Sequence, residues 1–394
     1  MIRQDYFFWN RAPIAPLKIL AMDNCKELGA MADAHVVAIR KENLEDYREK
    51  DLTILTRNYD KNTYLTQAAC PRFGSGEAKG VLKESVRGCD LFILTDVTNH
   101  SQSFQMYGQP HYMSPDDHYQ DLKRVVAAAM SSAYRVNVIM PFLYESRQHK
   151  RLNRESLDCA MALEELSDMG VANIITFDAH DPRVQNAIPL HDFDSYSPVY
   201  HFMKVLNEKY PDFSFDKDEL MIISPDEGAM SRAVYLANNL GVNMGMFYKR
   251  RDYSRIVNGK NPIVAHEFLG ADVEGKTVIV IDDIISSGES MLDTTRALKE
   301  RNAGHIIICC TFGLFTDGLA RFDEAYKNGW FDCVVTTNLN YRIPELLSRP
   351  WYLEADMSKY VAKIINTMNH NVAVSSVLTP TQKIQTLLKK KGLR

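Results

Sequence analysis

The stretch VIVIDDIISSGES, residues 278–290, decides the fold of this chain. Its first four residues are apolar without interruption, a pattern typical of a strand that is buried on both faces in a parallel sheet. Asp282 and Asp283 then fall at the carboxyl end of that strand, which is the edge where open α/β sheets bind ligands. We therefore expect a parallel α/β sheet with a ligand site at these two aspartates.

The residues after the aspartates indicate which ligand this edge would bind. Ser286, Ser287, Gly288 and Ser290 form a loop of small residues ahead of a helical pattern at 291–298. Backbone N–H groups in such a loop, together with the helix dipole, form a cradle for a phosphate. The two carboxylates beside it could hold the vicinal hydroxyls of a sugar, directly or through a metal, so the stretch favours a sugar-phosphate site. The structural alternative is that the serines and aspartates only cap the helix.

The composition is that of an ordinary globular protein. The chain is 45% hydrophobic and 24% charged. Its 394 residues are long enough to form two domains with full cores. A formal net charge of −4 gives no electrostatic footprint for nucleic acid or anionic membrane. No apolar run approaches a membrane span, and the start MIRQDYFFWNR is too polar for a signal peptide. The seven cysteines contain no CxxC pair, so we expect a reduced, cytoplasmic protein without a disulfide framework.

Strand and helix patterns alternate along the chain, which predicts a doubly wound α/β architecture with mostly parallel sheets. The expected strands are residues 18–21, 91–95, 136–140, 174–177, 219–223, 278–281, 306–310 and 333–337, and the expected helices are 119–132, 156–169, 231–240 and 291–301. The polar, proline-containing segment 189–197 is the predicted crossing between two domains. These domains are 1–191 and 192–394, the second ending in a helical, basic tail.

Three motifs follow expected strands and carry charged or metal-binding side chains. PFLYESRQHKR, residues 141–151, places Arg147 and Gln148 at the carboxyl end of one strand. TFDAH ends another strand in His180, which could ligate a divalent metal bound to phosphate. ISPDEG places Asp226 near the start of a helix. A solvated turn, a structural histidine and a helix cap are the respective structural alternatives.

Two further motifs concern phosphate charge and a turn rich in glycine. FYKRRD puts Lys249 and Arg251 at the end of a strand at 244–248, ahead of a polar segment without periodicity. Such a segment is typical of a mobile loop that closes over polyphosphate, although an exposed turn is equally compatible. FGSGE, from Phe73 to Glu77, lacks the GK[ST] ending of a P-loop and by itself predicts only a turn.

The order of these motifs resembles that of the ribose-phosphate pyrophosphokinase family. Seven motifs between residues 17 and 362 occur in the same order as their counterparts in the family: FGSGE, ESVRGCD, PFLYESRQHKR, TFDAHDPRVQNAIP, ISPDEGAMSRA, FYKRRD and VIVIDDIISSGES. The resemblance implies two phosphoribosyltransferase-like (type I) domains. It also implies transfer of the β,γ-diphosphoryl group of ATP to the anomeric hydroxyl of ribose 5-phosphate, with Mg²⁺ as cofactor. The expected assembly is a homo-oligomer built from dimers, of which a hexamer is one form.

The resemblance assigns a role to each matched residue. ATP-binding positions are Phe73, Glu77, Arg147 and Gln148, of which the first two contact the adenine from a neighbouring subunit; metal-binding positions are His180 and Asp226; catalytic cations are Lys249 and Arg251; and ribose 5-phosphate-binding positions are Asp282, Asp283, Ser286, Ser287, Gly288 and Ser290. These roles agree with the chemistry, because positioning and charge stabilisation dominate phosphoryl transfer.

The chain also departs from the family's pattern. Ser75 replaces the usual asparagine of the adenine motif, and His149 stands where an aspartate commonly follows the Arg-Gln pair. Glu289 replaces a glycine and puts a negative charge beside the predicted phosphate cradle. Insertions near residues 39–69 and 101–117 lengthen the first half. Two other functions stay open: a non-catalytic regulatory relative that binds a partner synthetase, and a phosphoribosyltransferase that uses phosphoribosyl pyrophosphate.

Overall fold

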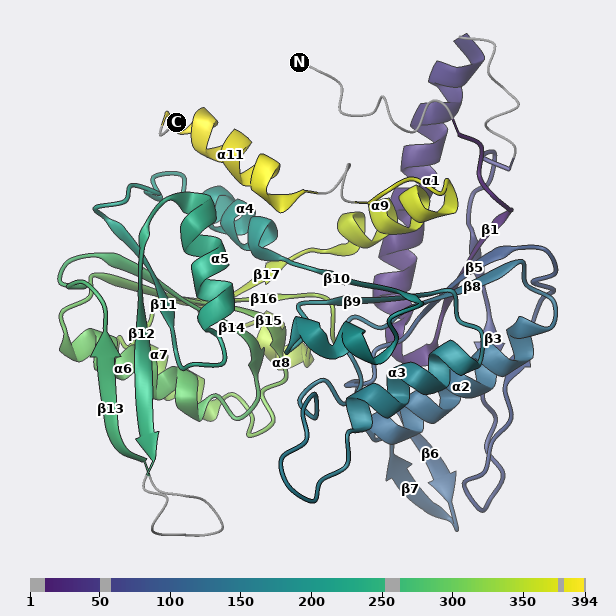
Figure 1. Ribbon diagram of the computed structural model, residues 1–394, viewed down its shortest axis with the longest axis horizontal. Coiled ribbons are helices and arrows are strands. Elements are labelled where there is room, and N and C mark those ends of the chain that lie inside the picture. The colour runs from purple at the N-terminus through teal and green to yellow at the C-terminus, as the bar shows by residue number, and fades with distance from the viewer. Residues whose placement is uncertain (1–10, 50–57, 252–262, 375–378, 393–394) are drawn as a thin grey trace. The chain divides into compact units, whose positions relative to one another are not determined.

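Figure 1 shows the computed structural model, which describes residues 11–49, 58–251, 263–374 and 379–392. Within these ranges, the side chains of residues 45–49, 249–251 and 263–266 are not described. The chain forms two compact units. Unit 1 comprises Met1–Ser197, Asn338–Tyr341 and Asp356–Thr379, and unit 2 comprises Pro198–Thr337, Arg342–Ala355 and Pro380–Arg394.

Unit 1 is built on a six-stranded sheet in the order β10-β9-β8-β5-β1-β2, with every neighbouring pair parallel. The strands are β1 Leu17–Ala21, β2 Leu65–Thr66, β5 Asp90–Leu94, β8 Arg135–Ile139, β9 Asn173–Phe177 and β10 Asp192–Tyr196. Every residue of β5 and of β9 is buried. This explains why the central strands are continuous apolar runs, since helices cover both faces of a parallel sheet.

The helices of unit 1 divide between the two faces of this sheet. They are α1 Lys26–Glu49, α2 Pro115–Met130, α3 Asp158–Asp168 and α9 Ser358–Asn369. The strand order reverses direction at β1, so right-handed crossovers place α1 on the face opposite α2 and α3. Helix α9 packs against α1 (Figure 1). Two short antiparallel pairs complete the unit: β3 Ala68–Ala69 with β4 Val81–Leu82, and β6 Ser103–Met106 with β7 Gln109–Tyr112.

The predicted domain limits differ from the observed units in two respects. The segment expected to be a crossing contains β10, which pairs with β9, and the units change at Ser197 and Pro198. Strand β10 is polar because it is an edge strand and only partly buried. Residues 338–341 and 356–379 also belong to unit 1, whereas the sequence places them in the second domain.

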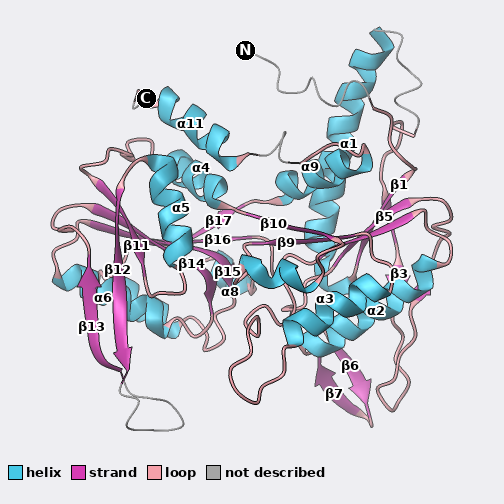
Figure 2. Cartoon of the chain, viewed as in Figure 1, coloured by secondary structure: helices cyan, strands magenta, loops and turns pink. Residues whose placement is uncertain are grey.

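Unit 2 has a seven-stranded sheet in the order β13-β12-β11-β14-β15-β16-β17, parallel except for β13. The strands are β11 Leu220–Ser224, β12 Asn243–Arg251, β13 Ile263–Leu269, β14 Thr277–Ile285, β15 His305–Gly313, β16 Cys333–Thr337 and β17 Tyr352–Ala355. The helices are α4 Val199–Lys209, α5 Met230–Leu240, α6 Glu289–Glu300, α7 Ala320–Lys327, α8 Pro344–Leu347 and α11 Pro380–Lys390. Figure 2 shows the strands of this sheet in magenta between cyan helices.

The two faces of β14 belong to two separate hydrophobic cores. Val278 and Val280 pack with residues of α6 and α7. Ile279 and Ile281 point to the other face and pack with residues of α4, α5 and α11. The prediction that this strand is buried on both sides is therefore confirmed, and with it the doubly wound α/β fold. In the described part of the chain, no helix is both long and apolar enough to cross a membrane.

Candidate functional site

The two aspartates of unit 2 lie within strand β14 rather than after it. The sequence predicts that the strand ends at residue 281, but β14 continues to Ile285 because β15 runs alongside it, with Asp282 opposite Cys310. On its other side, β14 pairs with β11 only as far as Val280. The strand therefore carries Asp282 and Asp283 past the end of its neighbour, at the carboxyl edge of the sheet.

The charges of three carboxylates interact at this edge. The pKa of Asp282 is raised well above its usual range, first by burial and then by the negative charges of Asp283 and Asp226. The backbone N–H of Asp283 donates to Oδ1 of Asp282 at 2.8 Å. Carboxylate oxygens accept hydrogen bonds, so this edge suits the hydroxyls of a sugar.

Arg232 of α5 compensates part of this negative charge. Its Nη2 lies 3.3 Å from Oδ2 of Asp283, and the side chains of both residues are less than one-tenth exposed. The sequence motifs do not single out this residue as part of the site. The available signal was its place in ISPDEGAMSRA, six residues after Asp226 in the helix that follows β11.

Asp226 has the capping role that the sequence allowed, in addition to its charge at the site. Its Oδ1 accepts hydrogen bonds from the backbone N–H groups of Gly228 at 2.9 Å and Ala229 at 3.3 Å, at the start of α5. The hydroxyl of Ser224 donates to the backbone carbonyl of Asp226 at 2.6 Å. These bonds fix the carboxylate while its charge acts on Asp282. The capping interpretation is therefore confirmed, and the role of Asp226 near ribose and metal stays a prediction.

The loop of small residues forms a tight turn between β14 and α6. Gly288 has a φ of 83°, and a Cβ at this position would lie 2.3 Å from the ring of Phe322. Ser286 and Ser287 are half-buried, while Glu289 is exposed as the first residue of α6. The N–H of Thr316 donates to the carbonyl of Ser286 at 3.0 Å, which ties the turn to the loop that follows β15.

The two predicted catalytic cations are only partly described. The backbones of Lys249 and Arg251 belong to β12, which pairs with β13 in an antiparallel ladder. Their side chains lie outside the described residues, as do residues 252–262 of the segment that follows. The strand extends beyond the expected end at residue 248 because β13 supplies a partner for it.

In unit 1, two loops at the carboxyl edge of the sheet contact each other. The loop after β8 carries Arg147, which is exposed, and Gln148, whose Nε2 donates to the carbonyl of Ser156 at 2.8 Å. The loop after β9 carries His180, whose backbone N–H donates to the hydroxyl of Ser146 at 3.0 Å. This bond links the Arg-Gln pair to the predicted metal-binding histidine.

His149, a departure from the expected pattern, lies beside that histidine. Its ring centroid is 5.2 Å from the ring of His180, and its Nε2 is 3.5 Å from Oδ2 of Asp181. Burial lowers the pKa of His149, as does the nearby charge of His180. Asp181 pairs with Arg183, whose hydrogen bond lowers the pKa of that carboxyl to about 2.

The FGSGE segment is an exposed turn closed by its own backbone. The N–H of Phe73 donates to the carbonyl of Glu77 at 2.7 Å, and the N–H of Gly76 donates to the carbonyl of Phe73 at 2.9 Å. The hydroxyl of Ser75 donates to Oε2 of Glu77 at 2.9 Å. The side chain of Phe73 is 56% exposed, so its aromatic ring is accessible to solvent while the backbone of the turn is held by hydrogen bonds.

The matches to known proteins follow the same two units. Residues 17–170 match the family described as the N-terminal domain of ribose phosphate pyrophosphokinase, and residues 199–337 match the phosphoribosyl transferase domain. Together they span most of the chain.

This chain belongs to the ribose-phosphate pyrophosphokinase family.

Curated members of the family include the ribose-phosphate pyrophosphokinase of Staphylococcus haemolyticus (strain JCSC1435). It is 27% identical over 278 residues, which cover 70% of this chain and 77% of that protein. The enzyme of Staphylococcus epidermidis is also 27% identical, over 279 residues. Among solved structures, the phosphoribosylpyrophosphate synthetase from Mycobacterium smegmatis matches with a TM-score of 0.69 at 22% identity, over 90% of this chain and 99% of that one. The structural match supports the predicted fold.

The pyrophosphokinase motifs thus gather into three groups of described residues. On unit 2, the charges of Asp226 and Asp283 act on Asp282, which lies in the strand that leads into the small-residue turn. Arg147, Gln148 and His180 lie on linked loops of unit 1. Phe73 and Glu77 form a third group on a turn of their own.

Proposed function

We propose that this chain is a ribose-phosphate diphosphokinase, which makes phosphoribosyl pyrophosphate and AMP from ribose 5-phosphate and ATP. The observation that carries the proposal is the interaction of the Asp282, Asp283 and Asp226 charges at the strand that leads into a small-residue turn and helix α6. Carboxylates hold vicinal hydroxyls, and backbone N–H groups at a helix start hold a phosphate. One ligand that presents both groups is a sugar phosphate.

The proposed reaction has one displacement at phosphorus. The anomeric oxygen of ribose 5-phosphate attacks the β-phosphorus of ATP, the bond from that phosphorus to the bridging oxygen of AMP breaks, and the hydroxyl proton is lost to solvent. Asp282 and Asp283 hold the ribose, and residues 286–290 hold its 5-phosphate. Lys249 and Arg251 offset the charge that grows on the transferred group and on departing AMP. Arg147 and Gln148 orient the ATP.

In this proposal, Asp226 and His180 would hold a Mg²⁺ cofactor. Burial raises the pKa of Asp282 most, and the charges of Asp283 and Asp226 raise it further. His180 lies beside the loop that carries Arg147 and Gln148. No group of three metal-binding side chains occurs among the residues that the structure describes. Mg²⁺ does not require such a group, because it usually keeps several waters and binds substrate phosphates. When bound, it would neutralise phosphate charge.

The test is AMP formation from ATP and Mg²⁺, with and without ribose 5-phosphate. Lys249→Ala and Asp282→Asn are each expected to lower the sugar-dependent rate by roughly 10² or more, the usual cost of losing a group that stabilises a transition state. Lys299→Ala and Asp293→Asn remove exposed groups of the same kinds on α6 and should leave the rate unchanged. A folded protein that binds ribose 5-phosphate but releases no AMP would be a regulatory relative. Release of pyrophosphate from phosphoribosyl pyrophosphate on addition of a base would indicate a phosphoribosyltransferase.

A further inference from the structure

The β6–β7 hairpin is formed by residues of the segment near 101–117, which is expected to be an insertion relative to the family's pattern. Its strands pair from Ser103 opposite Tyr112 to Met106 opposite Gln109. The connecting residues Tyr107 and Gly108 have φ angles of 49° and 75°, the positive values that two-residue hairpin turns require. The hairpin is therefore a defined element, although most of its residues are exposed.

One strand of this hairpin contacts the turn that carries Phe73 and Glu77. The side chain of Met106 packs over Gly76, where an added Cβ would lie 2.7 Å from Sδ of Met106. The N–H of Tyr107 donates to the carbonyl of Gly74 at 2.9 Å. A backbone bond and a side chain from adjacent hairpin residues thus hold the centre of the turn.

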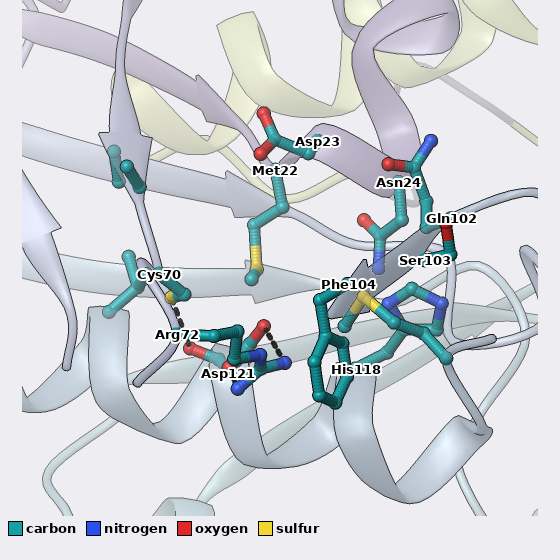
Figure 3. Close-up of a pocket in the computed structure, with 14 residues that line it drawn as sticks. Met22, Asp23, Asn24, Cys70, Arg72, Gln102, Ser103, Phe104, His118 and Asp121 are labelled. Carbon is teal, nitrogen blue, oxygen red and sulfur yellow. Dashed lines mark hydrogen bonds and ion pairs between the residues drawn. The ribbon is translucent and has the colours of Figure 1, made fainter. Parts of the chain in front are cut away.

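Phe104, two residues before Met106 and on the same face of β6, contacts Arg72. The guanidinium carbon of Arg72 lies 4.4 Å from the ring centroid of Phe104. Arg72 immediately precedes Phe73, so this contact fixes the entry to the turn. Figure 3 shows Phe104 beside Arg72 and Asp121. All three residues line a pocket of about 130 Å³.

Helix α2 holds Arg72 from the other side. Nη1 and Nη2 of Arg72 donate to Oδ1 and Oδ2 of Asp121 at 2.9 and 2.7 Å, the bidentate geometry that best fixes an arginine. Both side chains are less than one-tenth exposed. The turn is therefore supported from the protein interior by Asp121 and from its outer side by the hairpin.

We propose that the β6–β7 hairpin holds the Phe73–Glu77 turn ready for the purine of the nucleotide, with Phe104 and Met106 as positioning residues. A purine is the ligand that suits this turn, because an exposed aromatic ring can stack on it and Glu77 can accept a bond from an exocyclic amino group. A turn with two glycines and a serine would otherwise lose much conformational entropy on binding. The inference rests on the proposed function, since that function supplies ATP as the ligand.

The hairpin also accounts for the loss of the family's asparagine at position 75. Ser75 bonds to Glu77 within the turn, and a serine reaches less far than an asparagine. Contacts from Met106 and Tyr107 supply the constraint from outside the turn instead. The specificity of this chain for the base would then depend on a segment that the family's pattern does not contain.

The test compares Met106→Ala with Met106→Leu and with Tyr112→Ala. Tyr112 is a matched control, because it is an exposed side chain at the other end of the same hairpin. The first readout is amide hydrogen exchange at Phe73, Gly76 and Tyr107, whose N–H groups make the bonds described above. The second is the dissociation constant of ATP, measured by calorimetry, together with the KM for each substrate.

Met106→Ala is expected to speed exchange at these amides and to weaken ATP binding and raise its KM by about tenfold. The kcat and the KM for ribose 5-phosphate should stay unchanged, and Met106→Leu should restore ATP binding. Unchanged exchange in Met106→Ala would overturn the positioning role. Faster exchange with unchanged ATP affinity would overturn the link to the nucleotide. If the unaltered protein binds no ATP, the proposed function itself fails, and the exchange data still report whether the hairpin holds the turn.

Discussion

The amide oxygen of Asn369 accepts a 2.6 Å hydrogen bond from Nη2 of Arg40, and this bond joins α9 to α1 in the interior of unit 1. Arg40 is fully buried, its guanidinium lies over the rings of Tyr59 and Tyr64 at 4.8 and 4.6 Å, and its Nε donates to Asn366. The amide nitrogen of Asn369 in turn donates to Oδ2 of Asp90 at 2.8 Å. Asn369 therefore bridges a buried cation and a buried anion.

Asn369→Ala should destabilise the protein strongly, because the substitution leaves both Arg40 and Asp90 short of a partner in the interior. We expect a loss of about 3 kcal/mol in the free energy of unfolding, the scale for breaking a buried charged network. Urea denaturation measures it. Lys41→Met, which removes the exposed neighbour of Arg40 and its bond to Asn62, is the control and should cost less than ~0.5 kcal/mol. Equal effects of the two substitutions would contradict the bridging role.

His370 predicts a loss of stability in mild acid. Burial, and then the charge of Arg40, lower its pKa to about 4, below the value of about 6.5 in an unfolded chain. The folded state thus favours the neutral imidazole. Its contribution is complete above the unfolded pKa and is lost as the pH falls from about 6.5 through 4, a total of roughly 3 kcal/mol. His370→Gln should remove this part of the pH dependence, which urea denaturation at pH 4 to 7 can measure. The free energy of unfolding should then change less steeply with pH in His370→Gln than in the unaltered protein. An equal pH dependence in both proteins would refute the role of His370.

Arg232 should control the pH at which the proposed ribose 5-phosphate site works. It is the cation that pairs with Asp283, and the pKa of Asp282 is already raised by burial and by its acidic neighbours. Without Arg232 these carboxylates should bind protons still more readily. We expect Arg232→Met to reduce kcat/KM for ribose 5-phosphate about tenfold at pH 7, with partial recovery as the pH rises towards 9. Arg296→Met removes an exposed arginine from α6 and should shift nothing. If the kcat/KM of Arg232→Met, divided by that of the unaltered protein, is the same at pH 7 and at pH 9, the prediction is wrong.

The turn before α6 should tolerate no side chain at Gly288. Gly288 and Gly329 have similar positive φ angles, but only Gly288 has a neighbour, the ring of Phe322, in the space a Cβ would fill. Gly329→Ala should therefore cost only the backbone strain, about 1 kcal/mol. Gly288→Ala should cost about 3 kcal/mol, because the buried Phe322 has to move as well. Thermal unfolding of the two variants measures the difference, and ribose 5-phosphate binding should weaken only in Gly288→Ala.

The parts of the fold that the sequence predicts are those set by local pattern. Four apolar residues before Asp282 fill the two cores on either side of β14, so the pattern alone identifies a central parallel strand. The acids and the small-residue turn also follow from residue type and spacing. Strand β10 was missed because an edge strand needs little apolar surface, and its polar residues resemble those of a linker.

The parts that the sequence does not predict depend on partners far away along the chain. Strand β14 is longer than its apolar run because β15 continues beside it. Arg232 can be assigned to the site only because the folded structure places it on α5 within ion-pair distance of Asp283. The membership of α9 in unit 1 rests on bonds such as the one between Asn369 and Arg40, 329 positions apart, which no local periodicity can encode.

The division of unit 1 among three stretches of chain has a consequence for biosynthesis. A ribosome would release residues 1–197 long before residues 366–370 are made, and until then Arg40 and Asp90 have no Asn369 to satisfy them. The first unit would thus wait in an incomplete state while the second is translated. Contacts between distant residues also slow folding, because the chain between them must be ordered first. A chain truncated just before α9 should accordingly yield a first unit that depends on chaperones, whereas removing residues after 379 should spare it.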